Sequence, residues 1–145
     1  MDPYDSEKAA RVWQRVHPGS TASLSGESLT ALILQLQQLA ATYRHLSGHS
    51  TVLKTLSDKK RTQAACLRGL HILTIGSCPE PRLPQQKVEP FLAALRRCYT
   101  AEMQLLTQFS LHSTDPSHGA LFTSLTAEQK MHCKTILELV GKTKK

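Results

Sequence analysis

Four long segments of the chain place apolar residues three and four positions apart, the spacing of a helix with one buried face. A low aromatic content of 5%, with many Leu, Ala, Gln and Lys residues, favours helix over sheet. Helices of these similar lengths, about 35 Å each at 1.5 Å per residue, can cover one another's apolar faces as a bundle. We therefore expect an all-α four-helix bundle, with helices at about residues 25–47, 50–75, 86–111 and 115–140.

Capping residues mark the ends of the first two segments. Ser25 and Ser50 stand directly before the apolar patterns, where a hydroxyl can accept a hydrogen bond from a free backbone N–H. Gly48 and Gly76 follow the last apolar residues, as expected for glycine at a helix C-terminus. The sequence thus predicts two helices that begin and end at defined residues.

Proline sets the expected starts of the other two segments. The third begins near Gln86, with Pro90 tolerated only in the first turn. The fourth begins at Asp115 and Pro116, a capping residue followed by proline at the first helical position. It continues to Val140, and Gly141 is expected to end it.

The residues outside the four segments define the domain organisation. The stretch SCPEPRLPQQ, residues 77–86, contains three prolines and predicts an extended connection that can cross the bundle. Within residues 1–25, the stretch DSEKAARVWQRV predicts a short helix in an N-terminal lead segment. The bundle itself is expected to span residues 26–141, and residues 142–145 form a basic tail.

Polar side chains interrupt the apolar face of every segment near its middle. Residues three apart on one helix share a face, so these side chains would converge inside the bundle. Their presence at core positions is the main clue to function, because buried polar groups are costly unless they are paired. The positions are Gln35 in the first helix, Lys60 and Gln63 in the second, Glu102 in the third, and Gln129 and His132 in the fourth.

Such a layer has the layout of a two-metal centre but a different charge. Two-metal bundles use four carboxylates and two histidines to neutralise and hold two divalent ions. Here Glu102 supplies one negative charge and Lys60 one positive charge, so the layer is neutral. Two buried dications would leave roughly four charges uncompensated, at several kcal/mol each. The residues therefore argue against a normally charged two-metal site.

Two arrangements of the layer remain open from the residues alone. Lys60 can pair with Glu102, while the three glutamines and His132 satisfy the remaining donors and acceptors. Alternatively, the Lys60 side chain extends along the helix face to reach water, with Glu102 at the edge of the core.

Several stretches resemble a known family: AARVWQRVHP at 9–18, LAATYRHL at 39–46, QAACLRGL at 63–70, LRRCYTAE at 95–102 and AEQKMHCKTILELVG at 127–141. The chain resembles the ferritin-like, rubrerythrin-type superfamily, and specifically its small bacterial stand-alone members. The resemblance implies an antiparallel helix pair, a long crossover between the second and third helices, and a second antiparallel pair.

The resemblance also implies a set of metal-site positions. Family members with intact sites carry carboxylates on the first and third helices and Glu-x-x-His on the second and fourth. Glu102 and His132 match this pattern. The remaining positions depart from it, and they fall on Gln35 (or Gln38 in another register), Lys60, Gln63 and Gln129. The two CxxC pairs of a rubredoxin-like iron site are missing as well.

Three functions are consistent with the sequence. The leading expectation is a ferritin-like, non-catalytic binding or scaffold protein that has lost most of its di-metal site and has no cofactor. The alternative is a rubrerythrin-like oxidoreductase with a single iron, manganese or zinc ion at Glu102 and His132. The third is a nucleic-acid-associated bundle, suggested by a net charge of +7 but weakened by the scatter of the basic residues and the lack of stacking aromatics.

The remaining expectations concern compartment and partners. The four cysteines form no CxxC pair, which favours buried free thiols and a reducing compartment. The chain has no apolar run of membrane-spanning length, and MDPYDSEKAARVW lacks the apolar core of a signal peptide. We expect a cytoplasmic protein with no membrane contact. It is expected to form a homo-oligomer such as a dimer, or to bind another protein, rather than nucleic acid.

Overall fold

The computed structural model describes residues 24–143 except 79 and 81. The described part contains α2 (Gly26–Leu46), a short 3-10 helix (Ser47–His49), α3 (Thr51–Ile75), α4 (Phe91–His112) and α5 (Gly119–Thr143). The four α-helices pack together, so the expected all-α bundle is confirmed. The short helix expected within residues 1–25 lies outside the described residues.

The starts of α2 and α3 and the end of α3 follow the predicted capping residues, whereas Gly48 lies inside the short 3-10 helix without a positive φ and does not end α2. The Ser25 hydroxyl accepts a hydrogen bond from the backbone N–H of Ser28 at 3.0 Å, and the Ser50 hydroxyl accepts from that of Val52 at 3.2 Å. Gly76 ends α3 with φ at 98°, a left-handed conformation in which a side chain would be strained. Local sequence therefore sets the length of this helix pair.

Helix α4 begins at Phe91 rather than near Gln86, so the predicted start was five residues too early. Pro90 is the N-cap, with extended backbone angles (φ −58°, ψ 144°). The ring of Pro90 also disfavours helical angles for the preceding Glu89, so a helix could not pass through both residues.

Helix α5 begins at Gly119 rather than at Asp115. The Asp115 carboxylate accepts hydrogen bonds from the backbone N–H groups of Ser117 at 3.0 Å and His118 at 2.7 Å, and so closes a separate turn. A side chain at Gly119 would stand 2.5 Å from the carbonyl oxygen of Ser113, so this tight approach requires glycine.

The other end of α5 also differs from the prediction. The helix continues through Gly141 to Thr143, so the predicted stop at Gly141 was wrong. Gly141 faces open space, and its φ is not positive. A glycine ends a helix when it adopts the left-handed conformation, and here it does not.

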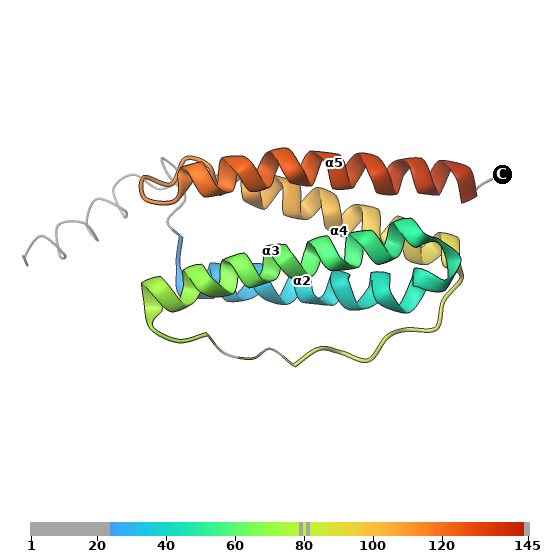
Figure 1. Ribbon diagram of the computed structural model, residues 1–145, viewed down its shortest axis with the longest axis horizontal. Coiled ribbons are helices and arrows are strands. Elements are labelled where there is room, and N and C mark those ends of the chain that lie inside the picture. The colour runs from blue at the N-terminus through green and yellow to red at the C-terminus, as the bar shows by residue number, and fades with distance from the viewer. Residues whose placement is uncertain (1–23, 79, 81, 144–145) are drawn as a thin grey trace, which may run out of the picture.

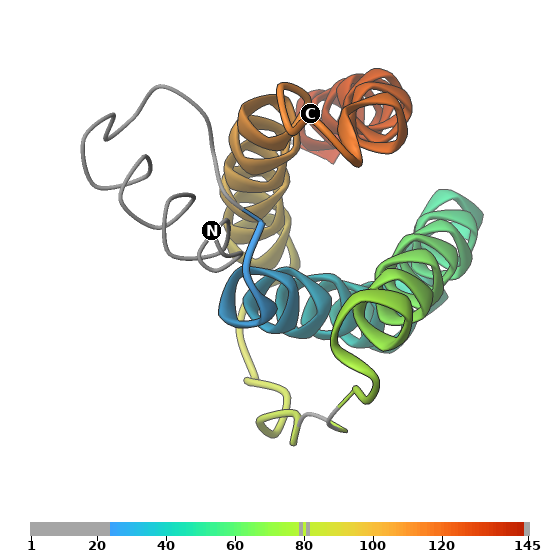
Figure 2. The ribbon, with the colours of Figure 1, turned by 90° about the vertical axis from the view of Figure 1, so that its left-hand side faces the viewer.

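The helices form two packed pairs. Helix α2 packs against α3, α4 packs against α5, and α2 also contacts α4. The connection after α3 runs the length of the bundle, so α3 and α4 point in the same direction (Figure 1). In the end view, α3 and α5 lie on the side away from the contact between α2 and α4 (Figure 2). None of the described helices combines the length and apolarity that a membrane crossing demands.

Candidate functional site

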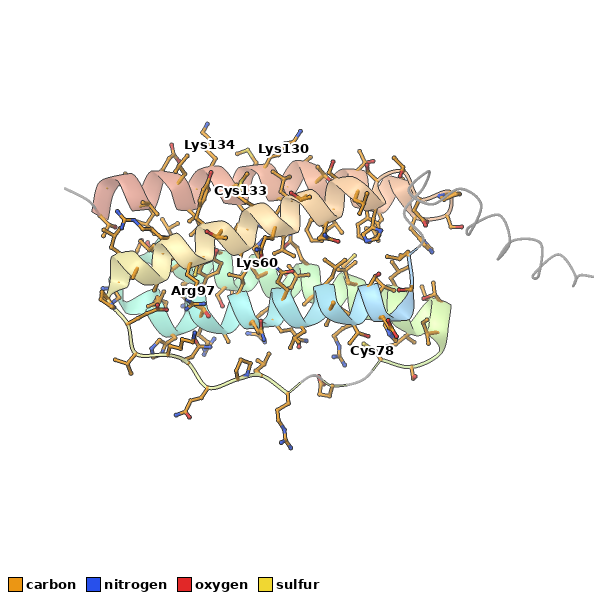
Figure 3. All side chains as sticks on the ribbon, turned by 180° about the vertical axis from the view of Figure 1, so that it is seen from behind. Lys60, Cys78, Arg97, Lys130, Cys133 and Lys134 are labelled. Atoms are coloured by element: carbon orange, nitrogen blue, oxygen red, sulfur yellow. The ribbon has the colours of Figure 1, made fainter. Side chains whose placement is uncertain are left out.

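A buried ion pair lies at the centre of the bundle. The Lys60 ammonium is 2.5 Å from a carboxylate oxygen of Glu102, and both side chains are 0% exposed. Figure 3 shows Lys60 between the helices, whereas Lys130 and Lys134 point outward from α5. Lys60 therefore pairs inside the core and does not extend to water.

Three further side chains surround this pair. The Tyr43 hydroxyl donates to one Glu102 oxygen at 2.5 Å, and the Gln129 amide donates to the other at 2.5 Å. Lys60 in turn donates to the amide oxygens of Gln129 at 2.6 Å and Gln63 at 3.1 Å. We call Tyr43, Lys60, Gln63, Glu102 and Gln129 the polar cluster; α2, α3, α4 and α5 each contribute to it.

The electrostatics of the polar cluster favour a closed, neutral unit. Burial lowers the pKa of Lys60, and the attraction of Glu102 opposes that shift. Burial, and then the negative charge of Glu102, raise the pKa of Tyr43 well above its usual value. Tyr43 therefore stays protonated and remains a donor. The pair has no net charge whichever partner holds the shared proton.

The first helix contributes a different residue from the one predicted. Gln35 is half-buried, and its amide donates to the carbonyl oxygen of Ala101 at 3.4 Å and to Gln104 at 3.5 Å. It does not join the polar cluster, and neither does the alternative Gln38, which faces the connection between α3 and α4. Tyr43 takes the place of the expected glutamine. The apolar spacing of α2 places Tyr43 near the layer, where its hydroxyl can complete hydrogen bonds, and in the structure that hydroxyl donates to Glu102.

His132 is buried next to the polar cluster but is not hydrogen-bonded to it. Its side chain is 3% exposed, and neither ring nitrogen has a partner among the described residues. Burial, together with the positive charges of Lys60 and Lys59, lowers the pKa of His132 to about 3. The ring is therefore neutral at physiological pH, with one nitrogen as donor and one as acceptor.

These residues do not fit a two-metal centre. Both oxygens of Glu102 already accept hydrogen bonds, and the Lys60 ammonium occupies the position where a cation would be attracted. Gln63 directs its amide to Glu128 at 2.8 Å, away from Glu102. Within residues 24–143 as described, no three side chains of the types His, Cys, Asp and Glu come together as metal ligands. The donor set therefore suits an ammonium and not divalent ions.

The cysteines are divided between core and surface. Cys98 and Cys133 are buried, as expected, and burial raises the pKa of the Cys98 thiol to about 12. Cys66 is exposed, so the expectation that it would be buried was wrong. It lies on α3 directly before the buried Leu67, but its own side chain is exposed.

Comparison with known proteins returns no match. No family model matches this chain, no curated protein is significantly similar to it in sequence, and no solved structure is significantly similar to it in fold. The fold and the site define the class: an all-α four-helix bundle with a buried, charge-neutral polar cluster at its centre.

Proposed function

We propose that this chain is a ferritin-like bundle in which a lysine-centred polar cluster has replaced a two-metal centre, and that it serves as a non-catalytic binding or scaffold protein. The observation that carries the proposal is the 2.5 Å contact between Lys60 and Glu102 at zero exposure. A lysine ammonium repels metal cations and supplies the positive charge that the carboxylate needs. The length-spanning connection between α3 and α4 is consistent with the ferritin-like part of the proposal.

A residual redox site at Glu102 and His132 is the less favoured function. To bind an ion, Glu102 would have to give up its contacts with Lys60, Tyr43 and Gln129. The lysine would then be buried without a counter-charge, which costs about 3–5 kcal/mol. The free energy of binding one metal ion to a single carboxylate and a single imidazole would have to exceed that cost.

Metal content tests the proposal directly. The full chain is purified without chelator, incubated with Fe²⁺, Mn²⁺ or Zn²⁺, desalted and analysed by mass spectrometry of the elements. We expect no stoichiometric metal in the wild-type chain. A stoichiometric ion that disappears in Glu102→Gln would contradict the proposal.

A matched variant makes the same test sensitive. Lys60→Glu combined with Gln129→Glu places three carboxylates at the bundle centre next to His132 and removes the ammonium. We expect this variant to retain metal when treated in the same way, because the local charge then attracts divalent ions. If neither chain retains metal, the ammonium does not decide metal binding, and the proposed reason is wrong.

Self-association fits a scaffold role. Three apolar side chains near the end of α3 are largely exposed, with Ile72 at 49%, Leu73 at 85% and Ile75 at 53%. Exposed apolar groups that lie together often mark protein contacts. We expect a dimer by light scattering coupled to gel filtration, and we expect Leu73→Lys to shift the chain to monomer. A wild-type monomer at high concentration would contradict this part of the proposal.

A further inference from the structure

A cavity of about 410 Å³ is lined by residues of α3 and α5. These two helices lie on the same side of the bundle (Figure 2). Its volume is within the usual range for small-molecule sites, about 300–1,000 Å³. Its wall combines apolar and polar side chains from both helices: Val52, Leu56 and Lys59 from α3, and Glu128, Met131 and His132 from α5.

His132 supplies this cavity with ring nitrogens that can form hydrogen bonds to a ligand. His132 lines the cavity and is only 3% exposed. Both of its ring nitrogens lack hydrogen-bond partners among the described residues. Buried polar groups without partners are rare in folded proteins because their lost hydration is not recovered. A molecule in the cavity with a hydrogen-bond donor or acceptor would replace the hydrogen bonds to water that the His132 ring loses on burial.

The charges around the cavity indicate an uncharged molecule. Lys59 and Glu128 stand at its exposed rim and carry opposite charges. Behind the wall, Lys60 and Glu102 also cancel each other. The Gln63 amide already donates to Glu128, which weakens that carboxylate as a partner for a cation. Neither an anion nor a cation would find an uncompensated opposite charge.

We propose that the cavity between α3 and α5 binds an uncharged apolar molecule carrying a hydroxyl or carbonyl group, with that group hydrogen-bonded to the His132 ring. Val52, Leu56 and Met131 would contact the apolar part of the ligand. The inference rests on the binding role proposed above and names the class of ligand. It does not depend on the metal measurement, which reports only on the polar cluster.

Three probes of similar shape test the ligand class. 2-Naphthol is uncharged and carries a hydroxyl, naphthalene lacks the hydroxyl, and 2-naphthoate carries a negative charge. We expect saturable binding of 2-naphthol to the full chain, followed by fluorescence, about tenfold tighter than naphthalene and 2-naphthoate, as for one recovered hydrogen bond. The ring nitrogens of His132 should shift in ¹⁵N NMR spectra as 2-naphthol is added.

Matched variants locate the site. His132→Leu should reduce the preference for 2-naphthol over naphthalene about tenfold, to none, while His112→Leu, at another buried histidine, should leave it unchanged. Met131→Trp should block both ligands at the rim, whereas Met103→Trp, at a similarly exposed methionine on α4, should not. Circular dichroism confirms that each variant is folded.

Three results would overturn the inference. The first is the absence of saturable 2-naphthol binding to the wild-type chain. The second is a preference for 2-naphthol that survives in folded His132→Leu. The third is tighter binding of 2-naphthoate than of 2-naphthol, which would assign the cavity to an anion. In each case the metal result for the polar cluster would still stand, so failure of the cavity and failure of the proposed function can be told apart.

Discussion

The polar cluster and His132 are both buried at the middle of the bundle, yet they differ in how completely they are hydrogen-bonded. In the cluster, both oxygens of Glu102 accept hydrogen bonds and the Lys60 ammonium contacts three oxygens. At His132, three residues after Gln129 on the same helix, neither ring nitrogen has a partner among the described residues. Every side chain of the polar cluster is hydrogen-bonded, whereas the ring nitrogens of His132 remain able to bond a ligand.

The difference suggests a division of roles along α5. The hydrogen bonds of the polar cluster hold its side chains in place and leave no free donor or acceptor at the ion pair for a ligand. An unpartnered neutral ring beside a cavity is a poor structural element but a suitable contact for a ligand. Under the two proposals above, residues that sequence spacing groups into one layer would serve two separate purposes in the folded chain.

The largest effect is expected from breaking the ion pair. Lys60→Met and Glu102→Gln each leave one buried partner without its counter-charge, so each should lower the free energy of unfolding by about 3–5 kcal/mol. Urea unfolding followed by circular dichroism measures this. The double variant Lys60→Met/Glu102→Gln should lose much less than the sum of the two single losses. Additive losses would mean that the two residues do not act as a pair.

The next effect is the pH dependence of stability caused by His132. Its pKa is about 3 in the folded chain, against about 6.5 for a histidine in an unfolded chain. Below pH of about 6.5 the unfolded chain gains a proton at this residue and the folded chain does not, so stability present above that pH is lost as the pH falls. The loss at pH of about 5 should be about 2 kcal/mol.

His132→Leu isolates this contribution. The variant has no titrating group at position 132, so its stability should fall by about 2 kcal/mol less than that of the wild-type chain between pH of about 7.5 and about 5. Urea unfolding at both pH values gives the comparison. Equal losses in the two chains would show that His132 is not held neutral in the core.

The smallest effect is expected from Tyr43→Phe. The change removes the hydroxyl that donates to Glu102 and leaves the ring in place, so it should cost about 1–2 kcal/mol. Tyr99→Phe, at a half-buried tyrosine on α4, is the matched control and should change stability by less than about 0.5 kcal/mol. If the two variants behave alike in thermal unfolding, the Tyr43 hydroxyl does not complete the network.

Much of the fold could be predicted because local chemistry determines it. The spacing of apolar residues predicted the four helices. Ser25 and Ser50 predicted the starts of α2 and α3, and Gly76 predicted the end of α3. The start of α5 and its extension past Gly141 could not be predicted. The first depends on a turn closed by Asp115, and the second on whether a glycine takes up a left-handed conformation.

The site was predictable only in part. A lysine and a glutamate at core positions were consistent with a buried pair or with a lysine that reaches water, and the structure joins Lys60 to Glu102. The exclusion of Gln35 depends on helix rotation and side-chain reach, which the spacing of three and four does not determine. The cavity depends on the separation of α3 and α5, which only the packed bundle defines.

The central claim is that an ammonium, and not a pair of metal ions, neutralises Glu102. Anomalous diffraction from crystals of the full chain grown with excess Mn²⁺, recorded near the manganese absorption edge, tests it most directly. We predict no anomalous peak between the helices and density for the Lys60 ammonium within hydrogen-bonding distance of Glu102. Two bridged peaks at Glu102, with Lys60 displaced, would contradict the account.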